Sequence, residues 1–336
     1  MKKQLIAAAV ATSVSAIAMA DISITGGMKA NYTYTDYGTA TVADKNQFKH
    51  ETDLSIKGKS GDTNVVINMS VTDQTTGDTS GASGKGDPDS SNAIEDVYMT
   101  TNVGGINVKA GQWDNGNNYL RASARNGGKV EASTTVGGMK VLYGNNNGNN
   151  AEYITLSGDL AGVAASYKKT DSGDEYKAST KVSGIGFAYH AINSDTANSD
   201  RNSIELTGSV GGVDVTVVKA EAESATCLAG DTWLGDFEDS SYDCDATNDA
   251  TYVMELTKGQ DITGVQLKTS LAGNTVQFRN TQIDDVASED TSINKIVVTR
   301  PLASGATLEV TYTDLEDDSS NDDDYESLDI ELAVKF

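Results

Sequence analysis

The residues Leu328-Asp329-Ile330-Glu331-Leu332-Ala333-Val334-Lys335-Phe336 end the sequence with an unbroken alternation of apolar and charged or small side chains. Side chains of a β-strand point to opposite faces with a period of two, so this segment predicts a ribbon that is apolar on one face only. At the free edge of a soluble sheet such a strand would promote aggregation, whereas a closed barrel gives it a neighbour on each side. The pattern therefore favours the last strand of a transmembrane barrel.

Residues 1–20 have the organisation of a secretory signal peptide. Lys2 and Lys3 are basic, the run 5–17 is apolar or small, and Ala18-Met19-Ala20 is a small-x-small cleavage site. No later stretch approaches the ~18 to 20 consecutive apolar residues of a membrane-spanning helix. We therefore expect cleavage after residue 20, a mature barrel at residues 21–336 and no transmembrane helix in it.

The same alternation recurs through most of the mature chain, and short glycine-containing turns divide it into hairpins. Eight such turns are expected, at 60–62, 104–105, 137–138, 159–162, 183–184, 211–212, 272–274 and 303–305. Longer polar connections separate the hairpins, at 73–92, 114–127, 193–201, 221–249, 284–292 and 314–325. The chain therefore predicts an all-β, antiparallel up-and-down transmembrane barrel with short periplasmic turns and long extracellular loops.

The expected number of strands is 16 to 18, because either 251–257 or 264–271 could form a hairpin within a loop instead of a barrel strand. A soluble β-sandwich or solenoid also has alternating strands. The residues that alternate with the apolar ones are strongly charged along many strands, and the sequence has no fixed-length repeat. Both observations favour the barrel.

Composition suits this fold and limits the partners. Glycine is frequent, with 33 residues, whereas there are only 2 prolines, as expected for many strands joined by glycine turns. The formal net charge of −24 becomes −26 once Lys2 and Lys3 are removed with residues 1–20. This charge excludes a nucleic-acid partner and favours cations.

Cys227 and Cys244 lie in an acidic loop of a secreted chain, which favours a disulfide between them. Closing a loop of this size would stabilise it by roughly 3 kcal/mol. No histidine lies near the pair in the sequence. We therefore expect no metal site at this pair, and a passive diffusion channel needs no cofactor.

Three stretches resemble the general porins of Gram-negative bacteria. They are the mature start Asp21-Ile22-Ser23-Ile24-Thr25-Gly26-Gly27, the hairpin 97–112 with its Gly104-Gly105 turn, and the terminal strand. The resemblance implies a homotrimer in outer-membrane lipid and lipopolysaccharide, with one aqueous pore per subunit. It also implies that Phe336 is an assembly signal for the barrel-assembly machinery. The chain departs from the family at Gln112, where general porins commonly carry an arginine.

By the same analogy, the loop 113–127 folds inward and constricts the pore. The constriction candidates are Trp113, Asp114, Tyr119, Arg121 and Arg125. This loop is short for the family, so the alternative is a wider pore, or a constriction by another loop such as 73–92.

If the apolar side chains of each strand face lipid, the charged side chains that alternate with them line the pore. The pore-wall candidates include Lys29, Lys49, Glu51, Asp53, Lys57, Lys109, Lys129 and Glu131. Positive and negative wall charges nearly balance, and the long loops carry the excess of carboxylates. Such a mouth attracts cations over roughly 10 Å at 0.1 M salt, so we expect weak cation selectivity. Alternatively, these loops are only solvated, or they bind divalent cations together with lipopolysaccharide.

Catalysis is not expected, because the only histidines, His50 and His190, stand near no recognisable nucleophile motif. The expected function is passive diffusion of small hydrophilic solutes and ions through a water-filled channel in the outer membrane. One alternative is a substrate-selective channel, which the sequence disfavours because aromatic residues such as Phe187 and Tyr312 share the lipid parity. The other is a non-conducting adhesin or structural barrel.

Overall fold

The computed structural model describes residues 21–38, 44–77, 91–114, 120, 128–146, 152–195, 200–222, 226–227, 255–256, 260–284, 290–317 and 324–336. The strands are β1 (Asp21–Asp36), β2 (Lys45–Ser60), β3 (Thr63–Gly77), β4 (Ser91–Val103), β5 (Ile106–Gln112), β6 (Lys129–Val136), β7 (Met139–Asn146), β8 (Glu152–Leu160), β9 (Val163–Thr170), β10 (Gly173–Val182), β11 (Ile185–Ser194), β12 (Arg201–Val210), β13 (Val213–Ala222), β14 (Thr226–Cys227), β15 (Glu255–Leu256), β16 (Gln260–Leu271), β17 (Asn274–Asp284), β18 (Thr291–Pro301), β19 (Thr307–Asp317) and β20 (Tyr325–Lys335). Across these ranges, no helix is long and apolar enough to cross a membrane.

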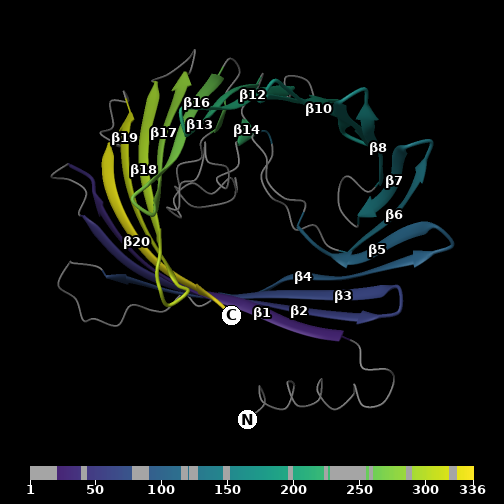
Figure 1. Ribbon diagram of the computed structural model, residues 1–336, viewed down its shortest axis with the longest axis horizontal. Coiled ribbons are helices and arrows are strands. Elements are labelled where there is room, and N and C mark those ends of the chain that lie inside the picture. Colours follow the sequence, from purple (N-terminus) through teal and green to yellow (C-terminus); the bar gives the residue numbers. More distant parts are fainter. Residues whose placement is uncertain are drawn as a thin grey trace, which may run out of the picture.

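Eighteen of the strands form one closed antiparallel ring (Figure 1). Each strand pairs with its neighbours in the sequence, β13 pairs with β16, and β1 pairs with both β2 and β20. At the seam, Gly26 and Phe336 exchange backbone hydrogen bonds of 2.8 and 2.9 Å. The predicted all-β transmembrane barrel is confirmed, with a strand number at the upper end of the expected range.

The uncertain count is resolved at the connection between β13 and β16. Within the segment 251–257 the structure describes Glu255 and Leu256, which form β15 and pair with the two-residue β14 outside the ring. The segment 264–271 belongs to the barrel strand β16.

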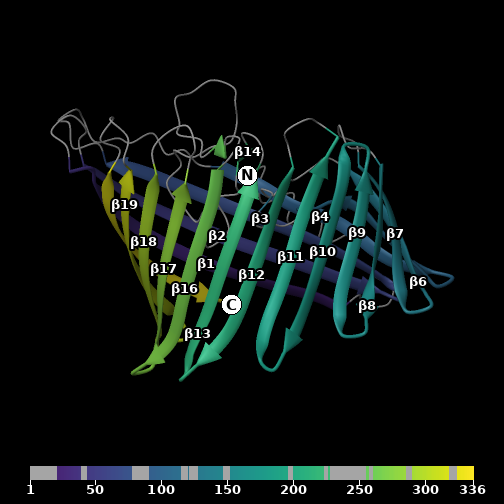
Figure 2. The same ribbon diagram turned by 90° about the horizontal axis from the view of Figure 1, so that it is seen from above.

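All eight predicted short turns connect barrel strands, and they share one rim of the ring (Figure 2). The Gly104-Gly105 turn needs glycine because φ is positive at both positions, 59° and 88°, as in the type I′ turns of tight hairpins. One connection at the opposite rim differs from expectation. Only Asp171 and Ser172 join β9 to β10, so that rim is not bounded by long loops everywhere.

Large apolar side chains cover the outward face of the barrel. Tyr32 on β1 is paired with Phe48 on β2 and with Ile330 on β20, and all three side chains are exposed. The apolar band therefore continues across the seam between the first and the last strand. Exposed apolar residues in such number are incompatible with a water-facing surface and suit lipid.

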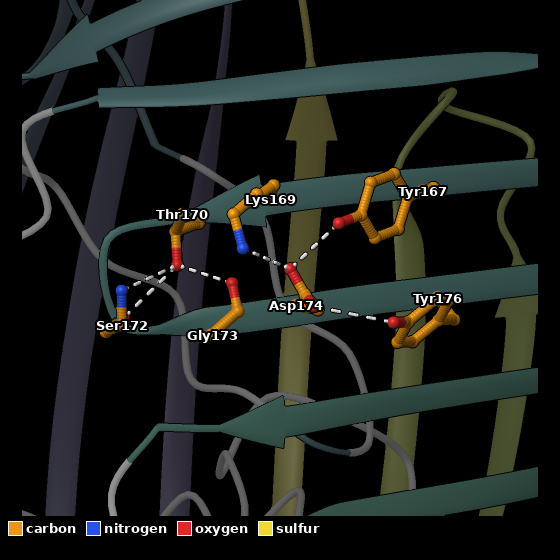
Figure 3. Close-up of polar contacts among 7 residues, drawn as sticks. All are labelled: Tyr167, Lys169, Thr170, Ser172, Gly173, Asp174 and Tyr176. Carbon is orange, nitrogen blue, oxygen red and sulfur yellow. Dashed lines mark hydrogen bonds and ion pairs between the residues drawn. The ribbon is translucent and has the colours of Figure 1, made fainter.

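A cluster of tyrosines and charged residues lies on the outward parity of β9 and β10, beside their short turn (Figure 3). The carboxylate of Asp174 accepts hydrogen bonds from the hydroxyls of Tyr167, at 3.0 Å, and Tyr176, at 3.5 Å, and Lys169 Nζ lies 3.4 Å from it. Tyrosine is favoured at a membrane surface because its ring suits lipid and its hydroxyl suits water. The cluster marks the edge of the apolar band at this rim.

Candidate functional site: the interior of the barrel

The strand register sorts the polar side chains onto a continuous inner face. Lys29 on β1 stands opposite Glu51 on β2, and Lys109 on β5 stands opposite Glu131 on β6. Each of these residues has the parity opposite to that of the exposed apolar side chains. The structure places all the pore-wall candidates of the sequence on this inner face: Lys29, Lys49, Glu51, Asp53, Lys57, Lys109, Lys129 and Glu131.

Two lysines and two aromatic rings form a packed corner on the inner face of β4 to β6. The Nζ atom of Lys109 lies 4.1 Å from the ring centroids of both Tyr98 and Trp113. Lys129 Nζ donates a 2.7 Å hydrogen bond to the carbonyl oxygen of Trp113, and Lys129 is only 1% exposed. Cation–π contacts of this kind contribute up to ~2 kcal/mol each when desolvated. They hold Trp113, the first of the constriction candidates, against the barrel wall.

The next constriction candidate is anchored at the same side of the barrel. The backbone N–H of Asp114 donates to Asp96 Oδ1 at 2.9 Å, and the amide of Asn68 donates to Asp96 Oδ2 at 2.7 Å. Asp114 is thereby tied to β4 and, through Asn68, to β3. The remaining candidates, Tyr119, Arg121 and Arg125, lie outside the described residues.

Leu120 lies against the opposite part of the wall. It is 0% exposed and belongs to a cluster of buried apolar side chains. The other members are Ile192, Val218, Ala220, Ala222, Ile262, Ile283, Ile293 and Leu315, from β11, β13 and β16 to β19. We call these eight residues the apolar dock. Arg201 of β12 donates a 2.6 Å hydrogen bond from Nη1 to the carbonyl oxygen of Leu120.

A third group of contacts continues along the inner face from β6 to β11. The hydroxyl of Tyr153 donates to Glu131 at 2.5 Å, and Lys168 Nζ lies 4.6 Å from the Tyr153 ring centroid. Further along, Glu175 contacts Lys177 at 2.7 Å and His190 at 3.0 Å. Both signs of charge are thus interleaved with aromatic rings along this arc.

Across the lumen, β1 and β17 to β20 line a cavity of about 70 Å³ that carries both signs of charge. Its residues are Asn31, Gln277, Arg279, Lys295, Val297, Glu309, Thr311, Asp329 and Glu331. Glu309 accepts a 2.8 Å hydrogen bond from the hydroxyl of Thr299. In the part of the chain that the structure describes, no group of three or more His, Cys, Asp or Glu residues could hold a metal ion.

Two other predicted features are the disulfide between Cys227 and Cys244 and the anchoring role of Phe336. Cys227 belongs to β14, whereas Cys244 lies outside the described residues, so their disulfide stays a prediction. Phe336 is 67% exposed beside β1, a placement compatible with the interfacial anchor that we expect it to be.

Sequence reasoning missed the contacts of Leu120, Arg201 and Glu175. No local pattern signals them, because they join residues 81 positions apart, for Arg201 and Leu120, and 15 positions apart, for His190 and Glu175. The parity of β12 does place Arg201 on the inner face, which was the one signal available.

A closed 18-strand ring with an apolar outside and a charged inside has the fold of an outer-membrane porin. No protein-family model matches the sequence, and no curated protein matches it. Similar solved structures include OccAB4 of Acinetobacter baumannii, a BenF-like porin of Pseudomonas fluorescens Pf-5 and OccK9 (OpdG) of Pseudomonas aeruginosa. Their TM-scores are 0.63, 0.65 and 0.64, at 10%, 12% and 11% sequence identity.

The three alignments cover 95%, 94% and 94% of this chain and 99%, 98% and 98% of the others. At such low identity they establish the fold and say nothing of the solute. The resemblance to porins thus holds at the level of the barrel. The narrower assignment to the general trimeric porins gains no support from these structures, which are named as Occ proteins and a BenF-like porin.

Proposed function

We propose that this barrel is a water-filled channel in the outer membrane of a Gram-negative bacterium, through which small hydrophilic solutes and ions diffuse. The observation that carries the proposal is the sorting of side chains by the closed register. Charged residues such as Lys29 and Glu51 share the inner face, whereas Ile24 and Phe187 are exposed outside. A barrel of this strand number encloses an aqueous lumen.

Weak cation selectivity is part of the proposal. Its support is the net charge of −24 together with an inner wall on which both signs nearly balance. The excess carboxylates then act at the mouth, where they raise the local cation concentration. High salt should weaken the preference, because exposed charges are screened.

The test is a planar-bilayer experiment with the purified protein. Large ohmic steps are expected, and under a KCl gradient the reversal potential should have the sign of a cation preference. A silent protein would overturn the channel and favour a structural barrel or adhesin. A clear anion preference would overturn only the selectivity.

A solute-selective channel is the second candidate, and one observation favours it. Tyr98, Trp113 and Tyr153 belong to the inner face, where they contact Lys109, Lys129 and Lys168, although the sequence pattern places most aromatic residues outside. Such rings and ammonium groups could bind a solute that has an apolar face and an anionic group. Small current steps that a solute blocks would distinguish this function from free diffusion.

A homotrimer, contact with lipopolysaccharide and recognition of Phe336 by the barrel-assembly machinery are proposed from the porin resemblance. Cross-linking of the purified protein in mild detergent tests the trimer. Finding only monomers after cross-linking would contradict it.

A further inference from the structure

Two segments that are close in the sequence lie at different parts of the barrel wall. Asp114 is bonded to Asp96 of β4, whereas Leu120 is buried in the apolar dock of β11, β13 and β16 to β19. Leu120 is six positions after Asp114, so the two anchors can be at most about 20 Å apart. Asp114 and Leu120 are therefore two positions, close in the sequence, that contact different parts of the wall.

The dock is an apolar surface inside a barrel whose inner wall carries many charged side chains. Ile262 and Ile283 face each other across β16 and β17, and Ala220 stands opposite Ile262. Leu120 is the one cluster member that does not come from a barrel strand. Burying a leucine side chain favours the docked arrangement by roughly tenfold to a hundredfold.

Arg201 supplies the polar half of the same contact. Its register partners are Ile192 on β11 and Ala222 on β13, both members of the dock. Its guanidinium therefore lies among apolar neighbours and donates a 2.6 Å hydrogen bond to the carbonyl oxygen of Leu120. A buried carbonyl group needs such a donor, and arginine provides one that stays charged at every physiological pH.

We infer that Leu120 and Arg201 form a tether that fixes the segment after β5 to the far wall and so sets the cross-section of the channel. Leu120 fills the dock, and Arg201 positions it by binding its backbone. This inference rests on the proposed channel function, and it assigns to two residues the role that the sequence assigned only to the loop 113–127.

The test compares Arg201→Met, Leu120→Asn and a control, Thr207→Met. Thr207 lies on the same inner face of the same strand, β12, and its register partners are Gly186 and Thr216, outside the dock. Single-channel conductance and the size limit for neutral sugars in liposome swelling should both rise in the first two variants and stay at the native value in the control. Because one contact is being broken, the double variant should exceed neither single variant appreciably.

Limited trypsin digestion gives a readout that does not depend on conduction. Cleavage after Arg121, the residue next to Leu120, should be roughly tenfold or more faster in both tether variants. Heat-modifiable mobility in gels verifies that each variant is folded. Folded Arg201→Met with native conductance and native cleavage would overturn the tether. A silent wild type whose variants are nevertheless cleaved faster would instead overturn the channel and keep the tether.

Discussion

The substitution Gly26→Ala should destabilise the barrel through a single added methyl group. A Cβ atom at Gly26 would lie 2.6 Å from the backbone carbonyl oxygen of Asp53 and 2.9 Å from two ring carbons of Phe336. The carbonyl belongs to the sheet and cannot move freely, so the strand itself must shift. Overpacking of this kind costs about 1–3 kcal/mol of unfolding free energy.

Gly58→Ala is the matched control. Gly58 has the same outward parity, on the neighbouring strand β2, and nothing lies within 4 Å of its added Cβ. Because alanine lowers the entropy of the unfolded chain, this variant should gain about 0.4–1 kcal/mol. Because the two variants should change the free energy of unfolding in opposite directions, the loss at Gly26 cannot be a general effect of replacing a strand glycine.

Urea unfolding of the protein in lipid vesicles measures both values by linear extrapolation. Adding Phe336→Ala to Gly26→Ala should recover part of the loss, because it removes the ring contacts and leaves the contact with Asp53. Equal stability changes at Gly26 and Gly58 would refute the reasoning. So would a double variant whose loss is the simple sum of the two single losses.

Three other outcomes follow from the register and the exposed charges. Glu309→Gln, on the inner face, should shift the KCl reversal potential toward the anion, whereas the outward-facing Glu221→Gln should not; equal shifts would contradict the sorting of faces. Phe336→Asp should lower the yield of folded barrel in membranes and leave the conductance of assembled channels unchanged, and normal assembly would count against the anchor. Lys219→Ala should lower the free energy of unfolding only slightly, and less at high salt, because the ammonium is half exposed although it pairs with Glu221 and Asp261 at 2.8 and 3.1 Å; a salt-independent loss in urea titrations would disprove an electrostatic origin.

The sequence predicted those features that a period of two and a glycine turn encode. The parity of Leu328 and Asp329 in the last strand reappears around the whole ring, and the Gly104-Gly105 hairpin is among the turns that the structure contains. These features could be read because strand geometry and turn geometry are local.

Contacts across the lumen could not be read in this way. Leu120 has no periodic neighbours that indicate its partner, and Arg201 looks like any other polar residue at the start of a strand. Likewise, Trp113 was named as a constriction candidate, but its position between Lys109 and Lys129 depends on how β4, β5 and β6 align. Such contacts require the shape of the closed ring, which alternation alone does not specify.

The seam between β1 and β20 has a consequence for how the molecule forms. Its hydrogen bonds join residues nearly the whole chain apart; Thr33 and Asp329, for example, are separated by 296 positions. Contacts of such high sequence separation bear the greatest loop-closure entropy and form slowly. Until β20 pairs with β1, both strands present open edges that invite pairing with other chains. The chain must therefore be protected from aggregation until β20 pairs with β1.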